Sequence, residues 1–110
     1  MADFVIKEWN LNPHPGDQAP RHVHHGSDEA FYVLDGELEV LEGDERRILT
    51  TGELAFIPAG MVHTFANRGP AATRILVVMT PEIDALISAL HSGDADADVW
   101  ARYNASVVAP

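Results

Sequence analysis

The stretch that decides the fold of this protein is residues 16–36, GDQAPRHVHHGSDEAFYVLDG. It places three of the chain's six histidines within four positions, at His22, His24 and His25, and Glu29 follows them. Alternate residues of a strand point to the same side, so His22 and His24 share one face and His25 points away. A short turn can then bring Glu29 back beside His22 and His24. The stretch therefore predicts a pair of strands that collects potential metal ligands.

Short apolar segments separated by glycine turns continue through most of the remaining chain. Turn dipeptides such as Asp35-Gly36, Thr51-Gly52 and Ala59-Gly60 punctuate them. Many short strands at regular spacing are typical of an antiparallel barrel or sandwich. We therefore expect an all-β barrel over residues 1–80. Its predicted strands are residues 4–9, 21–25, 29–35, 37–42, 46–50, 53–58, 63–67 and 73–80.

The pattern becomes helical after Thr80. Thr80 suits a helix N-cap, Pro81 suits the first helical position, and Gly93 suits the end of the helix. Apolar residues at i, i+3, i+4 and i+7 form one stripe. That stripe consists of Ile83, Leu86, Ile87 and Leu90.

A shorter second helix is expected over residues 96–104. It begins with an N-cap at its first residue and carries Trp100 and Tyr103 on one face. Residues 105–110 are predicted to form a loose tail. We expect residues 81–110 to be a helical extension packed on the outside of the barrel, within a single domain overall.

Composition excludes several classes of function. The 110-residue chain contains no cysteine, so disulfides and thiolate metal sites are excluded. Its net charge of −10 repels phosphate backbones and anionic lipids, and no basic cluster exceeds the pair Arg46–Arg47. The longest aliphatic run, residues 75–79, is too short to span a bilayer, and residues 1–10 lack the pattern of a signal peptide. We predict a cytoplasmic protein without nucleic-acid or membrane partners.

A fourth potential ligand lies in the second glycine-rich block, residues 52–67, where His63 follows a Pro58–Gly60 turn. Three imidazoles and one carboxylate suit one divalent transition metal ion, such as Fe, Mn, Ni, Cu, Co or Zn. If all four side chains bind one octahedral ion, two positions remain open for water or substrate. Open positions allow chemistry as well as a structural role.

Both blocks resemble the two sequence motifs of the cupin superfamily. The first motif is a glycine, five residues, His-x-His, three or four residues, Glu, six residues and a glycine. Its matches here are Gly16, His22, His24, Glu29 and Gly36. The second motif is a glycine, five residues, Pro-x-Gly, two residues, His, three residues and Asn. Its matches are Gly52, Pro58, Gly60, His63 and Asn67.

The resemblance implies a jelly-roll barrel, also called a double-stranded β-helix, with His22, His24, Glu29 and His63 as metal ligands. It also implies a small-molecule substrate. A quercetinase-like dioxygenase is the leading hypothesis, with Glu29 as a candidate catalytic base. The alternatives are a Lewis-acid isomerase, cyclase or lyase, and a binding module without catalysis. The non-functional interpretation of the same four residues is a relic site that no longer binds metal.

Strand alternation also predicts which side chains surround the metal. Phe31 and Val33 share a face with Glu29, and Phe65 and Asn67 share one with His63. Ordinary core packing explains the two phenylalanines equally well, and the family's asparagine is more often structural than catalytic. An aromatic, apolar wall would favour a planar or hydrophobic substrate over a sugar phosphate.

The remaining polar candidates are interpreted more simply. Arg21 and Arg74 are the only bases near the expected cavity, and rim salt bridges are favoured over anion binding for both. His14 is interpreted as an exposed turn residue, with contact to substrate at the barrel mouth as the alternative. Several strands are apolar on both faces, which predicts a homodimer through an outer sheet face or through residues 4–9.

Overall fold

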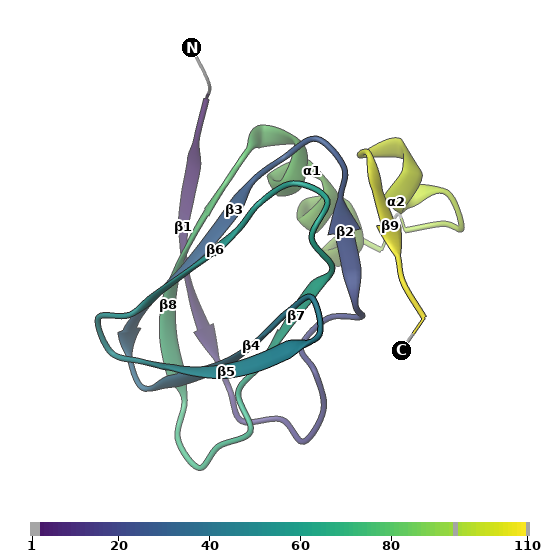
Figure 1. Ribbon diagram of the computed structural model, residues 1–110. Coiled ribbons are helices and arrows are strands. Elements are labelled where there is room, and N and C mark those ends of the chain that lie inside the picture. Colours follow the sequence, from purple (N-terminus) through teal and green to yellow (C-terminus); the bar gives the residue numbers. More distant parts are fainter. Residues whose placement is uncertain (1–2, 94, 110) are drawn as a thin grey trace.

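The chain folds into two antiparallel sheets that face each other, in a computed structural model that describes residues 3–93 and 95–109 (Figure 1). The four-stranded sheet has the order β1-β8-β3-β6, and the five-stranded sheet has the order β5-β4-β7-β2-β9. This arrangement confirms the all-β prediction. The strands are β1 (Val5–Leu11), β2 (His22–His24), β3 (Glu29–Asp35), β4 (Glu37–Glu42), β5 (Glu45–Thr50), β6 (Leu54–Ile57), β7 (His63–Ala66), β8 (Thr73–Met79) and β9 (Ala105–Val107).

The first eight strands lie where the sequence predicts them, with ends that differ by at most two residues. Their inward-facing side chains fill the space between the sheets. Phe31 and Val33 of β3 belong to the same buried cluster as Leu38 and Val40 of β4. Burying one such side chain stabilises the fold by about 1.5–3 kcal/mol. Truncating Phe31 to alanine would lower the free energy of unfolding by about 3–5 kcal/mol.

The glycine that closes the first motif is required by the packing of the barrel. Gly36 connects β3 to β4 with a φ of +107°, a backbone conformation that other residues rarely adopt. A Cβ atom there would also lie 2.8 Å from Oγ1 and 3.2 Å from Cα of Thr73. Because neither clash can be relieved without moving β8, Gly36 fixes the turn that follows the ligand strand.

The first predicted helix is confirmed as α1 (Pro81–His91). The Thr80 hydroxyl caps it by accepting a hydrogen bond from the backbone N–H of Ile83. Ile83 joins the barrel core, whereas Leu86 joins a second, smaller cluster with Val99. The apolar stripe therefore attaches the helix to two parts of the molecule.

The prediction for the second helix is wrong in its extent. The helix α2 (Val99–Arg102) begins after Asp98, and the Asp96 carboxylate instead accepts from the backbone N–H of Asp98 and from the Arg102 guanidinium. At the other end, Asn104 adopts a φ of +58° and turns the chain out of the helix. The contacts of Asp96 therefore shorten the helix at its start, and the backbone conformation of Asn104 ends it.

The prediction of a loose tail is also wrong. Residues 105–107 form β9, which pairs with β2 along its whole length, and Val108 donates a backbone hydrogen bond to the Arg21 carbonyl at 2.8 Å. Ala105 is buried against α1 and α2. The strand forms because β2 would otherwise present unpaired backbone groups at a sheet edge. Pro110, the last residue of the predicted tail, lies outside the described residues.

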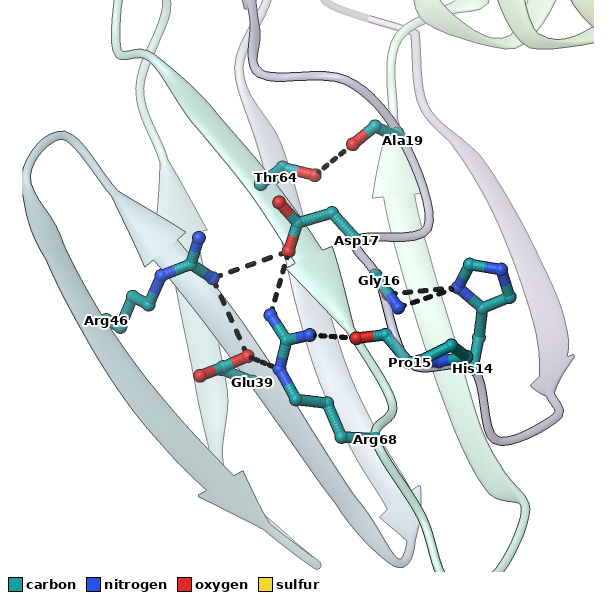
Figure 2. A network of polar contacts seen from close by, with 9 residues as sticks. All are labelled: His14, Pro15, Gly16, Asp17, Ala19, Glu39, Arg46, Thr64 and Arg68. Carbon is teal, nitrogen blue, oxygen red and sulfur yellow. Dashed lines mark hydrogen bonds and ion pairs between the residues drawn. The ribbon is translucent and has the colours of Figure 1, made fainter. Parts of the chain in front are cut away.

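A network of charged side chains fastens the loop between β1 and β2 to the five-stranded sheet (Figure 2). Arg68 donates to Glu39 Oε2 at 2.6 Å, to Asp17 Oδ1 at 3.1 Å and to the Pro15 carbonyl at 2.6 Å. Arg46 contacts the same two carboxylates at 3.4 and 3.6 Å. The loop that precedes the first histidine of the ligand strand is therefore held at several points.

Candidate metal centre

Four side chains from three strands meet inside one end of the barrel. His22 and His24 come from β2, Glu29 begins β3 and His63 begins β7. Antiparallel pairing puts His22 directly opposite His63, across 41 residues of sequence. All four residues are buried, and one ligand atom from each lies within 4.8 Å of the others. The structure therefore brings together the whole set that the motifs predict as ligands.

Backbone carbonyls fix the orientation of two of the imidazoles. The Pro20 carbonyl accepts a hydrogen bond from His22 Nδ1 at 2.7 Å, and the Met61 carbonyl accepts one from His63 Nδ1 at 3.0 Å. A carbonyl has no proton to give, so both Nδ1 atoms carry the hydrogen. The Nε2 atoms are then left with a lone pair available to a metal, and their direction is set by the loops before each strand.

The contact between His63 and Glu29 fits a cation. His63 Nε2 lies 3.0 Å from Glu29 Oε1, yet the proton of this ring is already given to Met61. In a neutral imidazole, two lone pairs would then face each other, and this repulsion is removed when a positive charge lies between them. His24 Nε2 is 3.8 Å from the same oxygen. The donor set and its arrangement therefore suit a divalent transition metal.

Electrostatics keep the two histidines of β2 in the form that binds metal. Burial, reinforced by the neighbouring His63, lowers the pKa of His22 to about 4. Burial, reinforced by His22 and His63, lowers the pKa of His24 to about 3. Both imidazoles are therefore neutral well below the ordinary histidine value of about 6.5. Neutral imidazole is the ligand form, so the site is prepared for metal without first losing protons.

A cavity of about 790 Å³ opens onto His22, His24 and Glu29. Pockets of this size accept small organic molecules. Phe65 borders the cavity, and its ring packs against Trp9 and Phe31 with centroids 6.1 and 5.2 Å apart.

The other predicted wall residues do not border this cavity. Phe31 and Val33 belong to the buried core, although the Phe31 ring lies near the candidate metal group, with its centroid 6.5 Å from that of His63. The Asn67 amide donates to the carbonyls of Leu11 and Ala71, at 2.8 and 2.9 Å, and so ties loops together. Strand alternation predicts the face of each residue, but it does not give the depth of the cavity along the strand.

Four polar candidates do not border the cavity. His25 is exposed and its Nε2 contacts Ser106 Oγ at 2.8 Å, which confirms that it points away from its neighbours. His14 is exposed in a turn, as predicted, and its Nδ1 accepts from the backbone N–H of Gly16 (Figure 2). Arg74 makes a surface ion pair with Glu8 at 3.6 Å, and Arg21 borders a separate depression.

Sequence reasoning missed the part of the wall that comes from the two helices. Trp100 of α2 lies against His22, with ring centroids 5.2 Å apart, and Leu86, Ile87 and Leu90 of α1 border the same cavity. The helices therefore line the metal centre as well as covering the barrel. The apolar stripe of α1 was visible in the sequence, but its position at the cavity follows from the packing of the helix on the barrel core and on the cluster with α2 and β9.

The fold and the buried group define a small β-barrel with a candidate metal centre at one end. Comparison with known proteins identifies the family of this barrel. The Cupin domain family matches residues 10–79, so the chain belongs to the cupin family. In sequence it is 35% identical to quercetin 2,3-dioxygenase of Bacillus subtilis over 75 residues. That match covers 68% of this chain and 22% of the enzyme, so the chain spans about a fifth of that relative's length.

Solved structures show the same barrel. The protein TT1209 of Thermus thermophilus is 37% identical, with a TM-score of 0.64 over 71% of this chain and 72% of that one. A cupin-superfamily sugar phosphate isomerase of Silicibacter pomeroyi is 30% identical, with a TM-score of 0.64 over 73% of this chain and 52% of that one. The similar proteins thus differ in activity on one shared fold. Within the described residues, no helix is long and apolar enough to cross a membrane.

Proposed function

We propose that this protein is a metal-dependent enzyme that acts on a small oxygenated organic molecule, with dioxygenase chemistry. The observation that carries the proposal is the buried group of three imidazoles and one carboxylate at the base of a cavity of about 790 Å³. The identity with quercetin 2,3-dioxygenase supports the type of reaction. A divalent transition metal held by His22, His24, Glu29 and His63 would supply binding positions for substrate oxygens and for O₂.

The chain's own residues have defined parts in this proposal. The carbonyls of Pro20 and Met61 hold two imidazoles in the ligating orientation. The apolar wall excludes water from the reacting atoms. Glu29 borders the cavity beside His63, and we assign it the removal of a proton from a substrate hydroxyl at Oε1.

Elemental analysis followed by oxygen uptake tests the proposal. The purified protein should contain about one transition metal ion per chain, and oxygen should be consumed with a flavonol or an enediol. Replacing Glu29 with glutamine keeps the shape of the side chain but removes its charge, so turnover should fall more than metal content. A protein that retains metal but turns over no compound in a broad panel would instead be a binding module.

A Lewis-acid isomerase is the second candidate, because a solved structure at 30% identity is a sugar phosphate isomerase. The two candidates differ in one measurable quantity. An isomerase converts its substrate without consuming oxygen, so product formation under strict anaerobic conditions would favour it.

We also propose that two copies assemble through the outer face of the four-stranded sheet. Strand register places apolar residues in a row across this face, from Ile6 through Val78 and Ala30 to Phe56. Ile6 and Phe56 are more than half exposed, and so is Leu54, which lies two residues before Phe56 on β6. An isologous contact would bury the same row on both copies, which suits a two-fold dimer better than an acidic or basic partner.

Light scattering after size exclusion tests the dimer. The protein should elute at twice the mass of the chain, and Phe56→Glu should shift it to the monomer. A wild-type monomer at high concentration would overturn the assembly. A cytoplasmic location is a further part of the proposal, and cell fractionation tests it.

A further inference from the structure

The cavity over the candidate metal centre is bordered by residues inside the segment that matches the family and by residues outside that segment. The ligands and Phe65 lie within the segment that matches the Cupin domain family, residues 10–79. The facing wall comes from α1 and α2, which lie beyond that segment. This second wall is therefore a feature of the present chain and is the place where its ligand preference can be set.

The chemistry of the helical wall is apolar and aromatic. Leu86, Ile87 and Leu90 supply the aliphatic part, and Trp100 supplies an indole ring whose centroid is 5.2 Å from that of His22. Trp9 borders the cavity from β1, so both tryptophans of the chain face the same space. Flat aromatic rings gain from such contacts beyond the area they bury.

Charge around the cavity argues against an anionic ligand. Among the described residues that border it, none is lysine or arginine. The two arginines expected from the sequence to lie near the cavity do not border it, since Arg74 pairs with Glu8 and Arg21 borders another depression. The chain as a whole carries a net charge of −10. Apart from the proposed metal itself and His91, a phosphate group would therefore lose its hydration without gaining a cationic side chain as partner.

We propose that the site takes an uncharged, planar aromatic molecule with oxygen substituents, and that Trp100 is the residue that determines this preference. The ligand ring lies against the indole, which places its oxygens toward His22, His24 and Glu29. This inference rests on the proposed function for the role of the metal, but the contact with Trp100 is a property of the wall itself.

A structural role for Trp100 is the competing explanation, because this residue also packs against the small cluster of Leu86, Val99 and Ala105. Tyr103 provides a matched control. It packs on the same cluster from the end of α2, but it does not border the cavity. A change that weakens only the packing of α2 should therefore affect Trp100 and Tyr103 variants alike.

The test is calorimetric titration with 3-hydroxyflavone as the planar probe and glucose 6-phosphate as the anionic probe. Wild type, Trp100→Leu, Trp100→Phe and Tyr103→Leu are each titrated in the metal-free and metal-loaded states. Trp100→Leu should weaken flavone binding about tenfold, whereas Trp100→Phe should stay within about threefold because it keeps a flat ring. Tyr103→Leu should bind like wild type, and glucose 6-phosphate should not bind.

Melting temperature and metal content confirm that each variant is folded. The inference is overturned if Trp100→Leu and Tyr103→Leu weaken binding equally, if flavone binds in neither state, or if glucose 6-phosphate binds at least as tightly. Failure of the proposed function has a different signature, since it shows as missing metal or missing turnover. Binding that depends on Trp100 in the metal-free protein would support the inference even then.

Discussion

The barrel and the C-terminal segment contribute to the same cavity in different ways. The barrel supplies the four candidate ligands, which strand pairing and the turns between strands bring together, and the segment from Pro81 onward supplies an apolar wall that no motif encodes. β9 joins them, because it pairs with the strand that carries His22 and His24. If the proposals above are correct, metal binding and ligand preference are encoded in separate stretches, and we predict that they can be changed separately.

The largest expected effect is the loss of metal from the barrel when one ligand is removed. His63→Ala should reduce metal content from about one ion per chain to nearly none, because the ligand set loses one of four donors. The matched control is His25→Ala, which removes an exposed histidine of the same region that bonds Ser106. Elemental analysis of both variants measures the effect. Undiminished occupancy in His63→Ala would show that the ligand set is wrong.

The second expected effect is a loss of stability at low pH, and it arises from two histidines of the barrel. Burial lowers the pKa of His22 to about 4 and of His24 to about 3, whereas both are about 6.5 in the unfolded chain. Below pH 6.5 the unfolded chain therefore binds protons that the folded metal-free protein does not. The free energy of unfolding of the metal-free protein should therefore fall as pH drops from 6.5 toward 3. Because the contributions of the two pKa shifts add, the total loss should be several kcal/mol.

Urea unfolding of the chelator-treated protein at pH 7, 5.5 and 4.5 measures this loss. His22→Gln should flatten the dependence, and His25→Ala should leave it unchanged. A metal-free protein whose stability does not change between pH 7 and 4.5 would contradict the buried, neutral state of these histidines.

The third prediction separates the two regions directly. Ala105→Asp places a charge in the cluster that attaches α1, α2 and β9, where Ala105 is 3% exposed. Burying an unpaired charge should cost about 3 kcal/mol or more and loosen the segment. Hydrogen exchange at the α2 amides should become faster, while metal content stays near wild type. A loss of metal as large as in His63→Ala would mean that the regions are not separable.

The smallest expected effect is that of the surface network in Figure 2. Arg68→Ala removes contacts to Glu39, Asp17 and the Pro15 carbonyl, but all of these are partly exposed. Stability should fall by about 1 kcal/mol or less, and the difference should shrink in high salt. Thermal unfolding at two salt concentrations measures it. A large loss of metal would show that the network also positions His22 through the loop ending at Pro20.

The barrel and its ligands could be predicted because they depend on local rules. Period-two alternation and glycine turns placed eight strands, and motif spacing placed His22, His24, Glu29 and His63 together. The C-terminal wall could not be predicted in the same way. The strand that follows α2 is β9, which has three residues, pairs with partners 81 to 85 positions away and has no periodic signal of its own.

The depth of the cavity could not be predicted from the sequence either. Phe31 and Phe65 both face inward, but only Phe65 borders the open space, because neighbouring side chains fill the barrel around Phe31. In the same way Trp100 of α2 and Tyr103, the residue that caps the end of α2, pack on the same cluster, yet only the indole borders the cavity. Such distinctions depend on three-dimensional packing and leave no trace in a one-dimensional pattern.

The pairing of β9 with β2 makes the two ends of the chain unequal as sites for a fusion. Val108 is hydrogen-bonded to Arg21, the residue directly before the first candidate ligand, whereas β1 belongs to the other sheet and lies well away from β9 (Figure 1). An affinity tag joined after residue 110 would begin within a few residues of the ligand strand, and a polyhistidine tag would add competing imidazoles there. Metal measurements should therefore use protein from which such a tag has been cleaved.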